Sequence, residues 1–243
     1  MAVRAMSDTI STNATDYAVT LAKSALGMVP IAGSFLAELA GTVIPRQRAD
    51  RLADFARGLA SKLGVIEQDV LRAKLIDENF TDLLEEGARE AVRAVSVERR
   101  EYVAQLISSG LTEVRVSYVE SKHLLRLLSQ LNDIEIIWLR YYDYPLLSGD
   151  NEFREKHAAI LTPISTKIGS GPDVIDKEAL QQNYVEHLVS LGMIVRPFKV
   201  DSLTGQPVFD IHRGEWQSQG RRTSPLGKLL LRQIGIACRG NAA

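Results

Sequence analysis

Four histidines have the widest chemical range in this chain, because imidazole binds metals and transfers protons near neutral pH. They are His123, His157, His187 and His212. They are far apart in the sequence and do not form an HxxxH or HExxH motif, with which one helix presents two imidazoles to a zinc ion. We therefore expect ordinary surface or partly buried histidines and no zinc site.

Carboxylates gather at Asp82, Glu85, Glu86 and Glu90, where they alternate with arginines along one stretch. On a helix this spacing places opposite charges three or four residues apart, which is typical of a solvated face with ion pairs. The same residue types could serve acid-base chemistry, but the interleaved arginines favour the structural interpretation.

Two further motifs are too incomplete to predict chemistry. The loop Gly169-Ser-Gly171 is not followed by the Lys-Ser/Thr pair of a phosphate-binding loop, so it is predicted to be a linker. Cys238 is the only cysteine, which excludes an intramolecular disulfide and a cysteine-based metal cluster. We predict no catalytic residue, no metal and no cofactor, although a site assembled only in space would leave no local motif.

Basic residues are concentrated towards the C-terminus. The whole chain of 243 residues has a net charge of −1, which gives no global indication of nucleic-acid or membrane binding. From Arg196 onward, however, eight basic residues face three acidic ones. Five of these cations are candidate contacts to phosphates or to a protein partner: Arg196, Lys199, Arg213, Arg221 and Arg222. Cations near a last helical turn also suit the helix dipole, which is the structural alternative.

Residues 17–44 form an apolar stretch in which only Lys23 and Glu38 are charged. Pro30 and Gly33 divide it into two arms, each too short to cross a bilayer alone. We favour a buried helical hairpin, and membrane insertion of both arms is the alternative. Its candidate contact residues are Met28, Val29, Pro30, Ile31, Phe35 and Leu36.

Helical periodicity dominates the next part of the chain. Apolar residues recur at helical spacing after Pro45 up to Leu63, and again over 80–95, 103–107 and 118–131. Asn79 and Ser96 are the predicted caps of the second and third of these helices. Residues 1–131 are therefore predicted to be an all-helical bundle.

The remaining residues, 132–243, change in character. Asn132 and Glu135 form a capping-box start for a helix over 134–142, a short helix is expected over 152–160, and Asp176 is the predicted cap of a helix that Gly192 ends. Residues 193–200 and 207–212 read as two strands of a hairpin closed by 201–205, and Ser224 with Pro225 starts a final helix. This order predicts a winged-helix-like domain, so the fold class is mainly α with a small β-hairpin.

A DNA-reading winged helix should offer basic or amide side chains from the helix before the wing. That helix has Asp176, Glu178 and Glu186 against a single Lys177. Its amides, Gln181, Gln182 and Asn183, are the side chains suited to base edges. The acidic surplus therefore favours packing or protein contact over DNA reading.

Several strings in this order resemble the abortive-infection alpha family of bacterial proteins. They are 83–110, 128–136, Leu191-Gly-Met-Ile194 and Ser224-Pro-Leu-Gly227. The resemblance covers about residues 80–235, leaves the apolar stretch 17–44 unmatched, and has Met193 where the family's turn carries leucine. It implies an accessory protein of phage defence that acts through contacts, and it supplies no catalytic residues.

Together these observations predict a non-enzymatic interaction protein of the bacterial cytoplasm that binds a protein partner or itself. The N-terminal residues lack the pattern of a secretory signal. One alternative is a membrane-active effector that inserts residues 17–44. A weaker alternative is a nucleic-acid binder that uses the basic wing and last helix.

Overall fold

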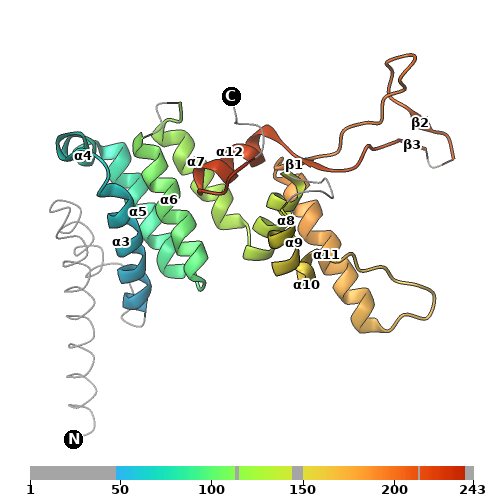
Figure 1. Ribbon diagram of the computed structural model, residues 1–243, viewed down its shortest axis with the longest axis horizontal. Helices are drawn as coiled ribbons and strands as arrows, with labels where there is room; N and C mark the ends of the chain where they lie inside the picture. The colour runs from blue at the N-terminus through green and yellow to red at the C-terminus, as the bar shows by residue number, and fades with distance from the viewer. Residues whose placement is uncertain (1–47, 113–114, 144–149, 213, 239–243) are drawn as a thin grey trace, which may run out of the picture. The chain divides into compact units, whose positions relative to one another are not determined.

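The computed structural model describes residues 48–112, 115–143, 150–212 and 214–238 (Figure 1). These residues are mainly helical, with short antiparallel strand pairs, and they divide into two compact units. The described part of the first unit is 48–112 and 115–129 with Gln233–Gly235. That of the second is 130–143, 150–212 and 214–232 with 236–238. Some predicted contact residues lie outside the described residues: Met28, Val29, Pro30, Ile31, Phe35, Leu36 and Arg213.

The first unit is built from helices, as its apolar periodicity predicts. They are α3 (Ala49–Leu63), α4 (Gln68–Leu75), α5 (Glu78–Arg93), α6 (Val97–Thr112) and α7 (Tyr118–Gln130). Helix α3 packs against α5 and α6, which also pack against each other. Its predicted apolar stripe is buried at every position: Leu52, Phe55, Ala56, Leu59 and Leu63. Helix α4 was not predicted.

Helices α5 and α6 approach each other closely at Gly87. A methyl group at this position would overlap the Cδ1 atom of Ile107, which is fully buried in α6. Glycine at this place therefore allows the two helices to pack without a displaced core side chain.

The predicted caps of this unit have different outcomes. Ser96 is confirmed, because its Oγ accepts a hydrogen bond from the backbone N–H of Arg99 at 3.1 Å. Asn79 as the cap of α5 is wrong: Asp77 is the cap, and its Oδ1 accepts from the backbone N–H of Asn79 at 2.9 Å. Aspartate and asparagine are both favourable caps, and Asp77 is the cap because it directly precedes the first residue of the helix.

Two arginines satisfy backbone carbonyls at the end of α5. Arg51 donates to the carbonyl of Val92 at 3.2 Å. Arg100, which is almost fully buried, donates to the carbonyls of Ala94 and Val95 at 3.1 Å each. Its guanidinium also pairs with Asp54 of α3 at 2.9 Å. This arginine contact ties α3 and α6 to the end of α5 and satisfies groups that a helix end leaves without intrahelical partners.

The second unit contains five helices in its described residues. They are α8 (Asp133–Asp143), α9 (Asn151–Lys156), α10 (Ala158–Leu161), α11 (Pro172–Ser190) and α12 (Pro225–Gln233). The reciprocal cap of α8 is confirmed, since Asn132 Oδ1 accepts from the N–H of Glu135 at 2.9 Å and Glu135 Oε2 accepts from the N–H of Asn132 at 2.8 Å.

Helix α11 begins earlier than predicted. Asp176 is not its cap, because the helix starts at Pro172 with Gly171 in the cap position. Proline suits a first helical turn, since its φ angle is already helical and its missing N–H would have no partner there. The predicted end is confirmed: Gly192 follows the helix in the left-handed region, with φ of 72°.

A long antiparallel ribbon, residues 194–223, follows α11, and we call it the arm. Its base pairs β1 (Ile194–Val195) with β4 (Arg222–Thr223), and farther out β2 (Phe209–Asp210) pairs with β3 (Glu215–Trp216). Figure 1 shows β2 and β3 near the end of the arm, away from β1.

The ribbon branches between these strand pairs. The N–H of Lys199 donates to the carbonyl of Gln217, the N–H of Gln217 to the carbonyl of Val208, and the N–H of Val208 to the carbonyl of Lys199. The predicted hairpin of 193–200 with 207–212 is therefore confirmed next to its turn and wrong along the rest of its length. These segments meet only near Val200 and Pro207, and the main partner of β1 lies far downstream in β4.

The base of the arm is fixed to the helices around it. Thr223 Oγ1 donates to the carbonyl of Leu139 in α8 at 2.8 Å. Ser224 Oγ donates to the carbonyl of Gly192 at 2.6 Å and accepts from the N–H of Gly227 at 3.0 Å, which confirms the predicted start of α12. A side chain at Gly227 would overlap the backbone carbonyl of Met193, so the tight approach of α12 requires glycine.

Candidate functional site

Three aromatic rings lie exposed along the arm. Phe209 contacts Trp216 with ring centroids 5.1 Å apart, and the ring centroid of Phe198 lies 6.2 Å from that of Trp216. Their exposed fractions are 53% for Phe198, 45% for Phe209 and 50% for Trp216. Rings of this size are normally more deeply buried, so these three adjacent half-exposed rings form an exposed apolar patch.

Strand pairing brings these rings to one place. Phe209 is directly opposite Trp216 in the β2–β3 pair, and Phe198 is opposite Ser218 in an isolated bridge. Alternate residues of a strand share a face, so Trp216 and Ser218 lie on the same side. The rings are therefore neighbours in space, although they are separated in the sequence by two turns.

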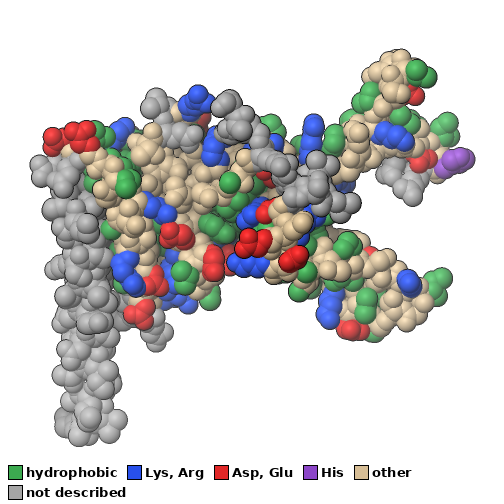
Figure 2. Space-filling model, in the orientation of Figure 1, with side chains coloured by type: hydrophobic (Ala, Val, Ile, Leu, Met, Phe, Trp, Pro, Cys, Tyr) green, Lys and Arg blue, Asp and Glu red, His purple; other side chains and the backbone are tan. Residues whose placement is uncertain are grey.

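Cations lie beside the rings. Arg196, Lys199 and Arg221 line one open groove together with Phe198 and Trp216, with a volume of about 860 Å³. The remaining lining residues are Asp210, Gln217, Ser218 and Gly220. Figure 2 shows hydrophobic and basic side chains next to each other on the arm, at the upper right of the view. The groove thus combines an apolar wall with positive charge.

Glu186 of α11 already binds two of these cations. Its Oε1 atom forms ion pairs with the guanidinium groups of Arg196 and Arg221, the latter at 3.2 Å. All three side chains are roughly 40–50% exposed, and ion pairs of this kind contribute at most about 1 kcal/mol each. Solvent and other anions can therefore compete for the two guanidinium groups.

Tyr142 of α8 adjoins this cluster. Burial raises the pKa of its phenol, and Glu186 acts in the same direction. The charge of Arg221 and its hydrogen bond to the phenol oppose that rise in pKa. Arg221 therefore connects the arm to both α8 and α11.

The five predicted basic contact residues have separate outcomes. Arg196, Lys199 and Arg221 share the groove, Arg222 lies in β4 opposite Val195, and Arg213 is outside the described residues. Within the part of the chain that the structure describes, neither Lys199 nor Arg222 has a side-chain ion pair.

The rings and Glu186 were not predicted as site residues. The available signal was aromatic residues next to cations, as in Phe198-Lys199, within a turn-rich stretch. Strand alternation by itself marks such residues as core, and only the pairing of distant strands shows that they face outward.

Gln181 is the one of the three amide side chains predicted to suit base edges that is occupied by its own unit, whereas Gln182 and Asn183 are exposed on α11. Gln181 holds the preceding loop, because its Oε1 accepts from the N–H of Ile164 at 3.0 Å and its Nε2 donates to the carbonyls of Ile160 and Thr162. Glu178 accepts from the N–H of Thr166 at 3.1 Å. These contacts make this face of α11 a packing surface for its own loop.

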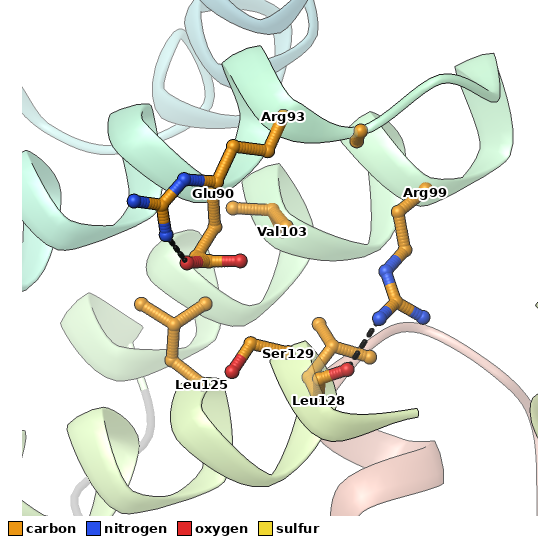
Figure 3. Close-up of a pocket in the computed structure, with 8 residues that line it drawn as sticks. Glu90, Arg93, Arg99, Val103, Leu125, Leu128 and Ser129 are labelled. Atoms are coloured by element: carbon orange, nitrogen blue, oxygen red, sulfur yellow. Dashed lines mark hydrogen bonds and ion pairs between the residues drawn. The ribbon is translucent and has the colours of Figure 1, made fainter. Parts of the chain in front are cut away.

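A smaller hollow lies in the first unit, between α5, α6 and α7 (Figure 3). Its volume is about 170 Å³, below the range of about 300–1,000 Å³ that is usual for small-molecule sites. Glu90 and Arg93 pair with each other at 2.9 Å along its wall, and Arg99 donates to the carbonyl of Leu128. These contacts are internal to the unit, so the hollow is a packing feature.

Other residues that could take part in acid-base or metal chemistry contact neighbouring side chains of the protein. His187 Nδ1 lies 2.7 Å from Oε1 of the buried Glu135. His157 contacts the ring of Phe153 in a tilted arrangement, and burial lowers the pKa of its imidazole. Lys122 forms ion pairs with Asp82 and Glu86. Among the described residues, no group of three or more metal-ligating side chains is present.

Comparisons with protein-family models, curated proteins and solved structures gave no match. The resemblance to the abortive-infection alpha family therefore stays a prediction. In the described part of the chain, no helix has the length and apolar content needed to cross a membrane.

Proposed function

We propose that this chain is a non-enzymatic interaction protein that binds a protein partner through the arm. The observation that carries the proposal is the cluster of three half-exposed rings, Phe198, Phe209 and Trp216, beside a basic groove. Aromatic residues and arginine supply much of the binding energy at protein interfaces. They bury a large area at the centre of the interface, and a polar rim surrounds them.

A winged-helix-like architecture for the second unit is part of the proposal. The order of α8, the short helices α9 and α10, α11, the arm and the closing helix α12 supports it. The arm then corresponds to the wing, and it serves as a contact surface. Helix α11 supports the arm through Glu186 and does not read bases.

The charge balance favours a protein over a nucleic acid. The groove has three cations, but two of them share Glu186, and Asp210 adds a second carboxylate nearby. A nucleic-acid groove is usually strongly positive along its length, because each bound phosphate carries a charge. A net charge of −1 for the whole chain adds no long-range attraction.

The biological role that we propose is phage defence in bacteria, as the family resemblance implies. The test is to express the chain in a bacterial host, to challenge it with a panel of phages and to measure the efficiency of plating. We expect the wild type to reduce plating of at least one phage. Trp216→Ser and Phe198→Ser should abolish this protection while leaving the melting temperature unchanged, because both rings are half exposed.

The matched control is Ile168→Ser, which removes a fully exposed apolar side chain from a loop outside the arm. It should protect as well as the wild type does. Protection that survives both arm substitutions would reject the arm as the contact surface. A wild type that protects against no phage of the panel would reject the defence role.

A further inference from the structure

We propose that the groove of the arm binds an acidic segment of the protein partner, and that Glu186 is the internal competitor of that segment. In this arrangement, carboxylates of the partner replace Glu186 on Arg196 and Arg221. A large apolar side chain of the same segment contacts Phe198 and Trp216. This inference rests on the proposed function and specifies the chemistry of its ligand.

The guanidinium groups of Arg196 and Arg221 already bind a carboxylate in the structure. Arg196 comes from the outgoing strand of the arm and Arg221 from the returning one, yet both reach a single oxygen of Glu186. They are therefore close enough to hold one carboxylate between them. Each guanidinium has five N–H donors, so most donors remain for a second acceptor.

Exposure makes the exchange feasible. Glu186 and its two partners are each about half exposed, so an incoming carboxylate can reach the guanidinium groups without unfolding any element. The exposed ion pairs are weak, and their replacement by an equivalent pair has little net cost. Lys199, which lines the same groove, adds a cation for a second acidic residue.

The aromatic rings determine which kind of side chain accompanies the carboxylates in the partner's segment. Phe198 and Trp216 line the groove next to the cations, and Phe209 extends the apolar surface. A ligand that only carried charge would leave these rings exposed to water. Burial of an apolar side chain against the rings adds a favourable free energy of binding that grows with the buried area. Exposed ion pairs do not provide this contribution.

The experiment titrates three probes into the full chain and follows tryptophan fluorescence. The probes are an acidic peptide of Asp, Glu and Leu residues, a peptide with Lys in place of the acidic residues, and a single-stranded oligothymidylate of about twelve nucleotides. Trp138 is buried and Trp216 is half exposed, so a change in fluorescence reports on the arm. A Trp216→Phe variant should lose the signal while calorimetry still detects binding.

Glu186→Gln provides the decisive variant. It replaces the competing carboxylate by a neutral amide, so we expect the acidic peptide to bind about two- to fivefold more tightly than to the wild type. The matched control is Asp176→Asn, which makes the same charge change on the exposed surface of α11, about 15 Å away along the helix. It should leave the affinity unchanged within about 1.5-fold.

Three outcomes would overturn the inference. One is equal affinity of the acidic and Lys peptides, another is tighter binding of the oligothymidylate than of the acidic peptide, and the third is no binding of the acidic peptide by wild type or Glu186→Gln even at about 1 mM. These outcomes are separable from failure of the proposed function. Phage protection that depends on Trp216 would still support the arm as the contact surface if the acidic peptide did not bind.

Discussion

Single glycines set the closest contacts of the first unit, and Gly87 is the clearest case. Gly87→Ala should lower the free energy of unfolding by about 1–3 kcal/mol, because the added methyl group overlaps the buried side chain of Ile107. Urea denaturation followed by circular dichroism measures the change. The control is Gly58→Ala in α3, where the nearest atom is the carboxylate of the flexible Glu101. It should stabilise by up to about 1 kcal/mol through helix propensity, and equal effects of both substitutions would contradict the packing account.

The thiol of Cys238 is a second residue whose behaviour depends on its surroundings. Partial burial, together with the nearby carboxylate of Asp143, raises its pKa from 9.0 to about 11. The thiolate is the reactive form, so alkylation by iodoacetamide at pH 8 should be roughly a hundredfold slower in the folded protein than in urea. Mass spectrometry of quenched samples gives both rates. A folded rate equal to the unfolded one would show that the thiol is not shielded.

At the scale of elements, the end of α5 depends on the arginine contact with α3 and α6. Arg100→Met should lower the free energy of unfolding by about 2–4 kcal/mol, because the carbonyls of Ala94 and Val95 lose their donor in a buried place. Arg57→Met is the matched control, since Arg57 pairs with the same Asp54 but is 60% exposed, whereas Arg100 is 8% exposed. It should change stability by less than about 1 kcal/mol. Similar losses for both would mean that the buried carbonyl contacts contribute little.

Helices were predictable from the sequence because their signals are local. Apolar residues at helical spacing located α3 and α5, and the paired cap of Asn132 with Glu135 located the start of α8. The choice between Asp77 and Asn79 as a cap was not predictable, since both residue types are favourable caps and each can accept from a backbone N–H two or three residues after it. Local signals therefore gave most of the described helices to within a few residues, although α4 was missed.

The arm could not be predicted in the same way, because its ladder joins distant residues. The turn signal at 201–205 is real, and Asp201 closes it by accepting from the N–H groups of Leu203 and Thr204. It makes only a small hairpin around Val200 and Pro207, while the base of the arm forms from β1 and β4. The candidate site follows from that pairing, so three of its cations were foreseen and its aromatic wall was not.

At the scale of the whole molecule, charge limits the classes of partner. The formal net charge is −1, although the residues from Arg196 onward contain a surplus of cations. A surplus confined to one element can orient a nearby acidic surface, but it gives little long-range attraction for a polyanion. This distribution of charge is one reason why we propose a local contact with a protein partner.

The small net charge and the local surplus of cations lead to a prediction for the binding of duplex DNA. If Arg196, Lys199 and Arg221 each neutralised a phosphate, the logarithm of the binding constant would fall against the logarithm of the salt concentration with a slope of about −3. We expect instead no measurable binding, or a slope close to zero, in fluorescence anisotropy with a labelled duplex between about 50 and 200 mM salt. Glu186→Gln removes the shared carboxylate and should raise any residual binding only slightly. A steep slope for the wild type would instead identify the arm as a phosphate-binding element, because neutralised phosphates alone release enough counterions to produce it.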